Sequence, residues 1–179
     1  MPAKEKINFR PKSQAKHKTS APYSPHALPS TPLAPHLIEF IHANRLHPQT
    51  ITPSLDRPVY LAGLRQNRRA ETIHDDLYVR ALALSDSNQT LVLCALDLIG
   101  FFRSDALEVI SKTLKVSETF RVSGDLEIII ASTFTHHGPD TIGLWGPNMN
   151  TSGVDPAYMA GLKEKIVEVI PFCVLRSKT

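Results

Sequence analysis

The run over residues 90–98 (TLVLCALDL) constrains the fold of this chain more than any other stretch. It is almost entirely apolar and ends just before Gly100. A nearly continuous apolar run of this length predicts a central strand that is covered on both faces of its sheet. The preceding run, residues 77–84, predicts a second strand, and residues 85–88 (SDSN) have the chemistry of a turn. Together the two runs predict a β-hairpin.

The hydrophobic period changes after this hairpin. Apolar residues recur at helical spacing over residues 106–114, and Ser104 stands where an N-cap is expected. Residues 126–133 predict a third strand. Pro156 then occupies the first position of a C-terminal amphipathic helix, whereas residues 171–179 predict no clear element. Strands and helices that alternate in this way predict an α/β fold, with a mixed sheet and flanking helices.

The N-terminal region differs in composition from the rest of the 179 residues. Ten of the fourteen prolines fall in residues 1–58, and residues 1–20 carry six lysines and arginines against one acid. This composition predicts a disordered basic, Pro-rich arm over residues 1–48, followed by one domain over residues 49–179. A basic arm can bind nucleic acid or anionic lipid. Since Phe9 is the one aromatic residue within residues 1–20, a solvated tail is the favoured interpretation and nucleic acid is not an expected partner.

Several classes of protein are not expected from the sequence. No run approaches the roughly 18 consecutive apolar residues of a membrane span, so the chain is not expected to be an integral membrane protein. No apolar segment follows the basic stretch as it would in a secretory signal peptide, and a cytoplasmic location is the default expectation. The two cysteines, Cys94 and Cys173, have no C-x-x-C spacing and are expected to be free thiols.

Three clusters contain the residues that could carry chemistry. They are residues 73–77 (IHDDL), Asp97 inside its apolar run, and residues 135–140 (THHGPD). If the first strand is antiparallel to the other two, His74, Asp97 and His136 share one edge of the sheet, where ligands of α/β proteins gather. Two imidazoles and a carboxylate that orients them suit zinc. From the residues alone, two alternatives stay open: hydrogen-bonded structural histidines, which are the commoner case, and an Asp97 that anchors the following loop.

Four segments, in order, resemble one protein family. ITPSLDRPVYLAG (51–63), IHDDLYVRALAL (73–84), TLVLCALDLIG (90–100) and IIIASTFTHHGPD (128–140) are similar to the N-terminal part of the catalytic domain of the neutral/alkaline, non-lysosomal ceramidases. Residues 154–170 also resemble the helix that follows the last of these motifs. The resemblance implies a zinc-dependent hydrolase of linear amides, with Zn²⁺ as its cofactor and a lipid amide of sphingolipid metabolism as its small-molecule substrate.

The resemblance also assigns roles to residues. His74 and His136 correspond to metal ligands, and a bound zinc would lower the pKa of its water for attack on the amide. Asp97 and His137 would be supporting residues.

The chain departs from the family pattern in several places. Phe134, His137 and Asp140 stand where the family has a histidine, a serine and a glycine. The family's further ligands, a Glu and a Tyr, lie much later in its sequence than residue 179 of this chain, which implies a domain truncated at its C-terminus. Two functions follow: part of a ceramidase-like amidohydrolase, or a truncated, non-catalytic binding or vestigial domain. A third hypothesis is a binder of nucleic acid or anionic membrane that acts through the arm.

Overall fold

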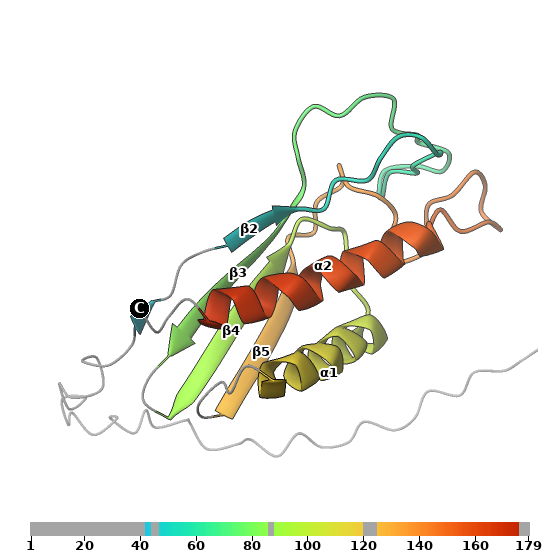
Figure 1. Cartoon of the computed structure of the whole chain (residues 1–179). Coiled ribbons are helices and arrows are strands. Elements are labelled where there is room, and N and C mark those ends of the chain that lie inside the picture. The colour runs from blue at the N-terminus through green and yellow to red at the C-terminus, as the bar shows by residue number, and fades with distance from the viewer. Residues whose placement is uncertain (1–41, 44–46, 86–87, 120–124, 176–179) are drawn as a thin grey trace, which may run out of the picture. The chain divides into compact units, whose positions relative to one another are not determined.

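The computed structural model describes residues 42–43, 47–85, 88–119 and 125–175. The predicted arm therefore lies almost entirely outside the described residues. The described part of the chain forms one mixed sheet with two helices, which confirms the predicted α/β class (Figure 1).

The centre of the sheet is the predicted hairpin. Strand β3 (Tyr78–Ser85) pairs antiparallel with β4 (Gln89–Leu96), and Leu82 opposes Leu93. Strand β5 (Asp125–Ser132) then runs parallel to β4. Because of these directions, the start of β3 and the ends of β4 and β5 meet at one edge of the sheet.

Two short strands complete the sheet on the other side of β3. Strands β1 (His42–Ala43) and β2 (His47–Thr50) both pair antiparallel with β3, and the sheet order is β1-β3-β4-β5 with β2 also beside β3. Both begin ahead of the domain boundary expected at residue 49. Their sequences have little apolar alternation, so their pairing with β3 is what defines them as strands.

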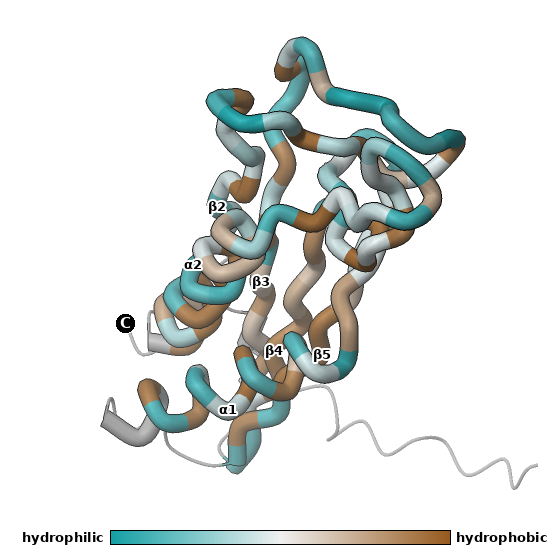
Figure 2. Tube along the Cα trace, turned by 90° about the vertical axis from the view of Figure 1, so that its right-hand side faces the viewer, coloured by the Kyte–Doolittle hydropathy of each residue, from teal (hydrophilic) through white to brown (hydrophobic). Residues whose placement is uncertain are grey.

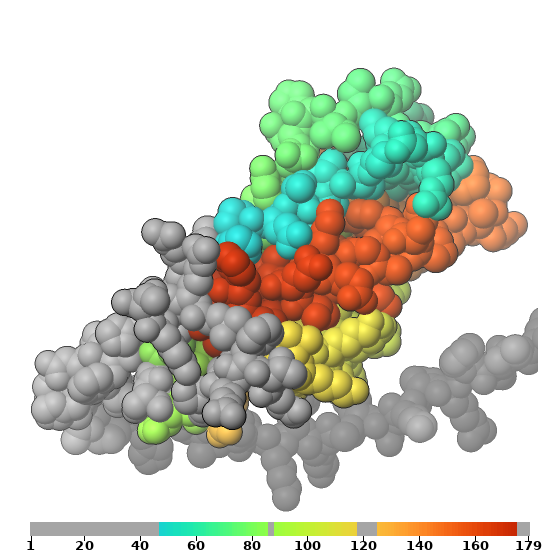
Figure 3. Space-filling view, in the orientation of Figure 1, coloured from blue at the N-terminus to red at the C-terminus, as the bar shows by residue number. Residues whose placement is uncertain are grey.

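Both helices lie on the same face of the sheet (Figure 2). Helix α1 (Arg103–Thr119) connects β4 to β5, and α2 (Pro156–Leu175) packs against β2, β3, β4 and α1. On the surface, α2 lies between β2 and α1 (Figure 3). Three large buried residues recur every four positions along α2, and each contributes about 1.5–3 kcal/mol by burial. They are Leu162, Ile166 and Ile170.

The structure corrects the expected burial of β4. Its side chains alternate between buried and exposed, and Leu93 is 38% exposed, so the strand is covered on one face only. The physical reason is that both helices pack on the side of Val92, Cys94 and Leu96. Although the opposite face is apolar in sequence, neither α1 nor α2 covers it.

The predicted N-cap of α1 is also corrected, and its buried face contains polar residues. The helix begins at Arg103, because the amide of Ala106 donates to the carbonyl of Phe102, so Ser104 lies within the first turn and is not the N-cap. The buried face of α1 contains Val109 and two polar residues, whereas Leu107 and Leu114 are exposed. The two polar residues are Thr113 and Ser117.

Helix α2 begins as predicted but continues further. Asp155 is its N-cap: the carboxylate accepts a hydrogen bond from the amide of Ala157 at 2.8 Å. The prediction that residues 171–179 form no element is wrong up to residue 175, because Pro171 lies inside the helix. Proline there removes one backbone hydrogen bond. Burial of Cys173 and Val174 against the sheet offsets that loss.

A candidate site in a cavity at the end of the sheet

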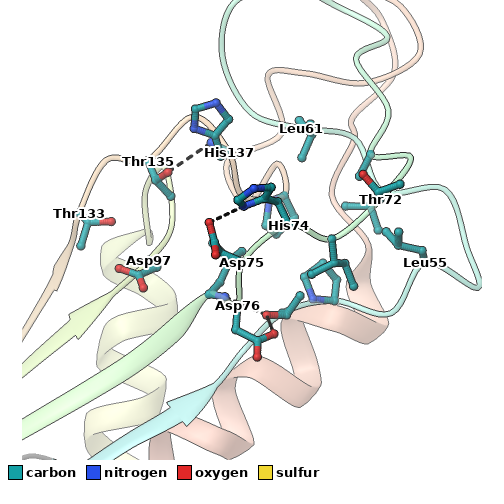
Figure 4. Close-up of a pocket in the computed structure, with 17 residues that line it drawn as sticks. Leu55, Leu61, Thr72, His74, Asp75, Asp76, Asp97, Thr133, Thr135 and His137 are labelled. Carbon is teal, nitrogen blue, oxygen red and sulfur yellow. Dashed lines mark hydrogen bonds and ion pairs between the residues drawn. The ribbon is translucent and has the colours of Figure 1, made fainter.

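A cavity of about 710 Å³ lies at the edge where β3 begins and β4 and β5 end. One part of its lining is apolar and comes from three loop segments and the residue that precedes β3. The polar part carries imidazoles and carboxylates. Figure 4 shows His74 near the centre of this lining, with Asp97 and the Thr135–His137 turn on one side of it. The apolar lining includes Leu55, Val59, Leu61, Ile73 and Leu77.

The segment that carries His74 is tied to the neighbouring loop by Thr52. The Thr52 hydroxyl accepts a hydrogen bond from the amide of Leu77 and donates one to Asp76, both at 2.8 Å. His74 itself projects freely: its side chain is 94% exposed, and its Nδ1 lies 2.7 Å from the carboxylate of Asp75. When Nδ1–H donates to Asp75, the lone pair on Nε2 is free for a metal ion or a proton.

Asp97 lines the cavity but is already engaged by the sheet. Its carboxylate accepts hydrogen bonds from the amide of Tyr78 at 3.0 Å and from Nη1 of Arg80 at 2.6 Å. The Arg80 guanidinium also lies over the Tyr78 ring, 4.8 Å from its centroid. These contacts let Asp97 fix the start of β3, and through it the position of the segment that carries His74.

The two adjacent histidines occupy different surroundings. His137 lines the cavity, and its amide donates to the hydroxyl of Thr135 at 3.2 Å. His136 is not part of this lining: its imidazole fills the space where a Cβ on Gly63 would stand and meets the ring of Phe134 edge-on, with centroids 5.2 Å apart. His74, Asp97 and His137 therefore line one cavity, and His136 lies beside it.

Arg68 fixes the turn that carries both histidines, a role that sequence reasoning missed. Its Nη2 donates to the carbonyls of Ala62 and His136. The neighbouring backbones also pair, because the amide of Ala62 donates to the carbonyl of Gly138. In the sequence Arg68 is one of three arginines within residues 65–69. Nothing in that run distinguishes the partly buried Arg68 from the exposed Arg65 and Arg69.

The donor set of the cavity meets part of what a catalytic zinc ion needs. Neutral imidazole oriented by a carboxylate is a suitable ligand type, and His74 with Asp75 provides it. A catalytic zinc ion usually has three protein ligands and a water molecule. Within the part of the chain that the structure describes, no group of three or more His, Cys, Asp or Glu side chains is arranged to hold a metal ion. By themselves these residues do not complete such a site.

Comparison with solved structures finds proteins with a similar fold. No protein-family model and no curated protein matches the chain. Among solved structures, the neutral ceramidase from Pseudomonas aeruginosa is 20% identical with a TM-score of 0.49, over 78% of this chain and 21% of that one. A structure described as ceramidase complexed with C2 is 20% identical with a TM-score of 0.46, over 77% of this chain and 20% of that one. The chain thus spans about a fifth of the length of these structures.

Proposed function

We propose that the cavity forms part of the site of a zinc-dependent, ceramidase-like hydrolase of linear amides, in which His74 and the His136–His137 pair supply imidazole to the metal. The observation that carries the proposal is the convergence of His74 and His137 on one cavity from sequence positions 63 residues apart. Zinc, when bound, would acidify a water molecule for attack on the amide carbonyl.

The shape and chemistry of the cavity support an amide with an apolar chain. Leucine, isoleucine and valine side chains cover one part of the lining, while imidazole and carboxylate groups gather in another. Ligand sites commonly combine an apolar wall with a few polar groups that orient the ligand. A linear amide with a hydrocarbon tail offers both kinds of surface, and a lipid amide is therefore the proposed substrate.

The two histidines of the pair are distinguished by different arguments. The sequence resemblance assigns the ligand to His136, whereas the cavity lining favours His137. Arg68 donates to the carbonyls of Ala62 and His136, which fixes the backbone from which the two imidazoles project. Single variants separate the two assignments.

Zinc content of the purified chain is the first test. Because the ligand set of the described residues is incomplete, zinc is measured at equilibrium with excess metal: the wild type should carry about one zinc ion per chain, and His74→Ala less than a tenth of that amount. Whichever of His136→Ala and His137→Ala loses the metal identifies the second ligand. His47→Ala, in strand β2, is the matched control and should leave the metal content unchanged. Absence of zinc from the wild type would refute the proposed ligands.

Amide hydrolysis tests the function separately from metal binding. A fluorogenic N-acyl amide with a long acyl chain should be cleaved by the zinc-loaded wild type, and His74→Ala should be slower by at least a hundredfold. Zinc binding without measurable hydrolysis would overturn the catalytic part of the proposal in favour of the alternative, a non-catalytic binding domain.

A further inference from the structure

Four large apolar side chains are exposed on the loops at the end of the sheet that holds the cavity. Leu64 is 79% exposed, Phe134 67%, Leu144 60% and Met149 82%. We call these four residues the apolar rim. Burying such side chains is favourable, so apolar residues that stay together on a surface are typical of an interaction site.

A chain of contacts joins the segments that carry Phe134, Leu64 and Leu144, and Met149 lies in the same loop as Leu144. Phe134 meets the ring of His136, and that ring lies against Gly63, the neighbour of Leu64. Two residues further on, the amide group of Gln66 donates to the carbonyl of Leu144 at 2.7 Å and accepts from the amide of Gly146 at 3.0 Å. The loops at residues 63–69 and 141–153 therefore lie side by side at the end of the sheet that holds the cavity (Figure 1).

The second loop is held in shape by one buried carboxylate. Asp140 is 1% exposed, and its oxygens accept hydrogen bonds from four backbone amides of the loop at 2.8–3.2 Å. A carboxylate that satisfies so many amides makes the loop rigid before any partner binds. The donors are the amides of Ile142, Gly143, Trp145 and Gly153.

Backbone strain coincides with the rim. Among the described residues other than glycine, only Leu64, Asn67 and Phe134 have a positive φ. Asparagine tolerates this conformation, but leucine and phenylalanine adopt it rarely and at a cost. Leu64 and Phe134 both have this unfavourable backbone conformation, and yet their large apolar side chains remain exposed to solvent.

Exposed positive charge lies in one of the two rim loops, and the next charged residue along the chain is Glu71. Residues 61–70 contain three arginines and no acid, and residues 141–154 contain no charged residue at all. Arg65 and Arg69 are exposed, whereas Arg68 is partly buried in its contacts with the loop carbonyls. Exposed arginines beside protruding apolar side chains suit an anionic surface with an apolar interior.

We propose that the apolar rim, with Arg65 and Arg69, docks this chain onto an anionic lipid surface and so places the mouth of the cavity against the membrane. Within the described residues, no helix is long and apolar enough to cross a bilayer, and the contact proposed is peripheral. The apolar side chains would enter the interface, where small protruding groups are accommodated by fluid lipid, and the arginines would meet the head groups. This contact requires neither zinc nor hydrolysis, so it stands or falls independently of the proposed function.

The sole tryptophan of the chain allows a direct test. Trp145 directly follows the rim residue Leu144 in the sequence. Its fluorescence would be measured with the full chain and vesicles of phosphatidylcholine and phosphatidylglycerol, some carrying brominated acyl chains, which quench an indole that reaches the interface. With anionic vesicles we expect a blue shift and quenching. With pure phosphatidylcholine, or in high salt, both effects should weaken at least fivefold.

Two matched triple variants distinguish the rim from other apolar surface. Leu64→Gln/Leu144→Gln/Met149→Gln should lower the partition coefficient on anionic vesicles at least tenfold, with an unchanged circular dichroism spectrum. Phe102→Gln/Leu107→Gln/Leu114→Gln replaces exposed residues in and beside α1 and should change it less than twofold.

Other outcomes would overturn the proposal. Equal losses in both triple variants would mean that exposed apolar surface in general drives binding. Vesicle binding without quenching of Trp145 would assign the contact to the basic residues 1–20. Absence of vesicle binding, with or without capture of a protein by the rim, would exclude a lipid surface as its partner.

Discussion

At the scale of single residues, the conformation of the cavity edge depends on Gly63. Its φ is +78°, and the imidazole of His136 occupies the space where a side chain would begin. Glycine is thus required twice at this position, once for the backbone angle and once for the close approach of a ring. A change here therefore affects the histidine turn directly, without altering the sheet or the helices.

The first prediction compares two glycines. Gly63→Ala should lower the free energy of unfolding by about 1–3 kcal/mol, because alanine is strained at positive φ and overlaps the His136 ring. Gly161→Ala, in α2, meets no atom within 4 Å and should raise it by about 0.5–1 kcal/mol, the usual gain in a helix. Urea denaturation of both variants measures these changes. Equal effects at the two positions would contradict the role assigned to Gly63.

At the scale of secondary-structure elements, α1 and α2 are joined by a charge network as well as by their buried side chains. The ammonium group of Lys163 on α2 lies 2.6 Å from Glu108 and 3.4 Å from Asp105, both on α1. Lys112 bridges Glu108 and Glu164 at 3.1 and 3.0 Å. Hydrogen bonds from Lys163, and then from Lys112, hold the pKa of Glu108 below its ordinary value of 4.5. The ionised form of Glu108 is therefore favoured by folding.

The second prediction follows from the sign of that shift. A carboxyl group whose pKa is lowered by folding adds stability above its unfolded pKa and loses it as the pH falls through the folded value. Glu108→Gln should therefore lower the unfolding midpoint at pH 7, and the difference from wild type should close as the pH falls below 4.5. Calorimetry at pH 7 and pH 3 measures this. Glu168→Gln, an exposed change on α2, is the control, and a pH-independent difference for Glu108→Gln would contradict the account.

The elements also show what can be predicted from this sequence. The β3–β4 hairpin, the strand β5 and the start of α2 were predicted correctly, because apolar period, turn chemistry and Pro156 act locally, whereas the parallel pairing of β5 with β4 entered only as a condition. The extension of α2 past Pro171 was missed, since it depends on burial of Cys173 and Val174 in the tertiary structure. For the cavity, the sequence predicted that His74, Asp97 and the histidine pair lie at one edge of the sheet. Which of the two adjacent histidines lines it depends on Gly63 and Arg68, contacts that no local pattern records.

At the scale of the whole described fold, the uncovered face of the sheet is the main liability. Both helices pack on one face, while Leu93 and Ile129, paired across β4 and β5, are 38% and 53% exposed on the other. In the described sheet, β5 is also an edge strand. An apolar face beside a strand edge favours association between copies, since exposed edges template further pairing.

The third prediction tests that liability. Ile129→Lys places a charge in the middle of the uncovered face, next to an edge strand, and should raise at least threefold the protein concentration at which light scattering detects association. Its thermal midpoint should stay within a few degrees of wild type, because the side chain is already 53% exposed. Leu107→Lys, on the outer side of α1, adds the same charge at a similarly exposed position and controls for net charge. If both variants suppress association equally, the effect comes from overall charge, and the uncovered face is not where the copies meet.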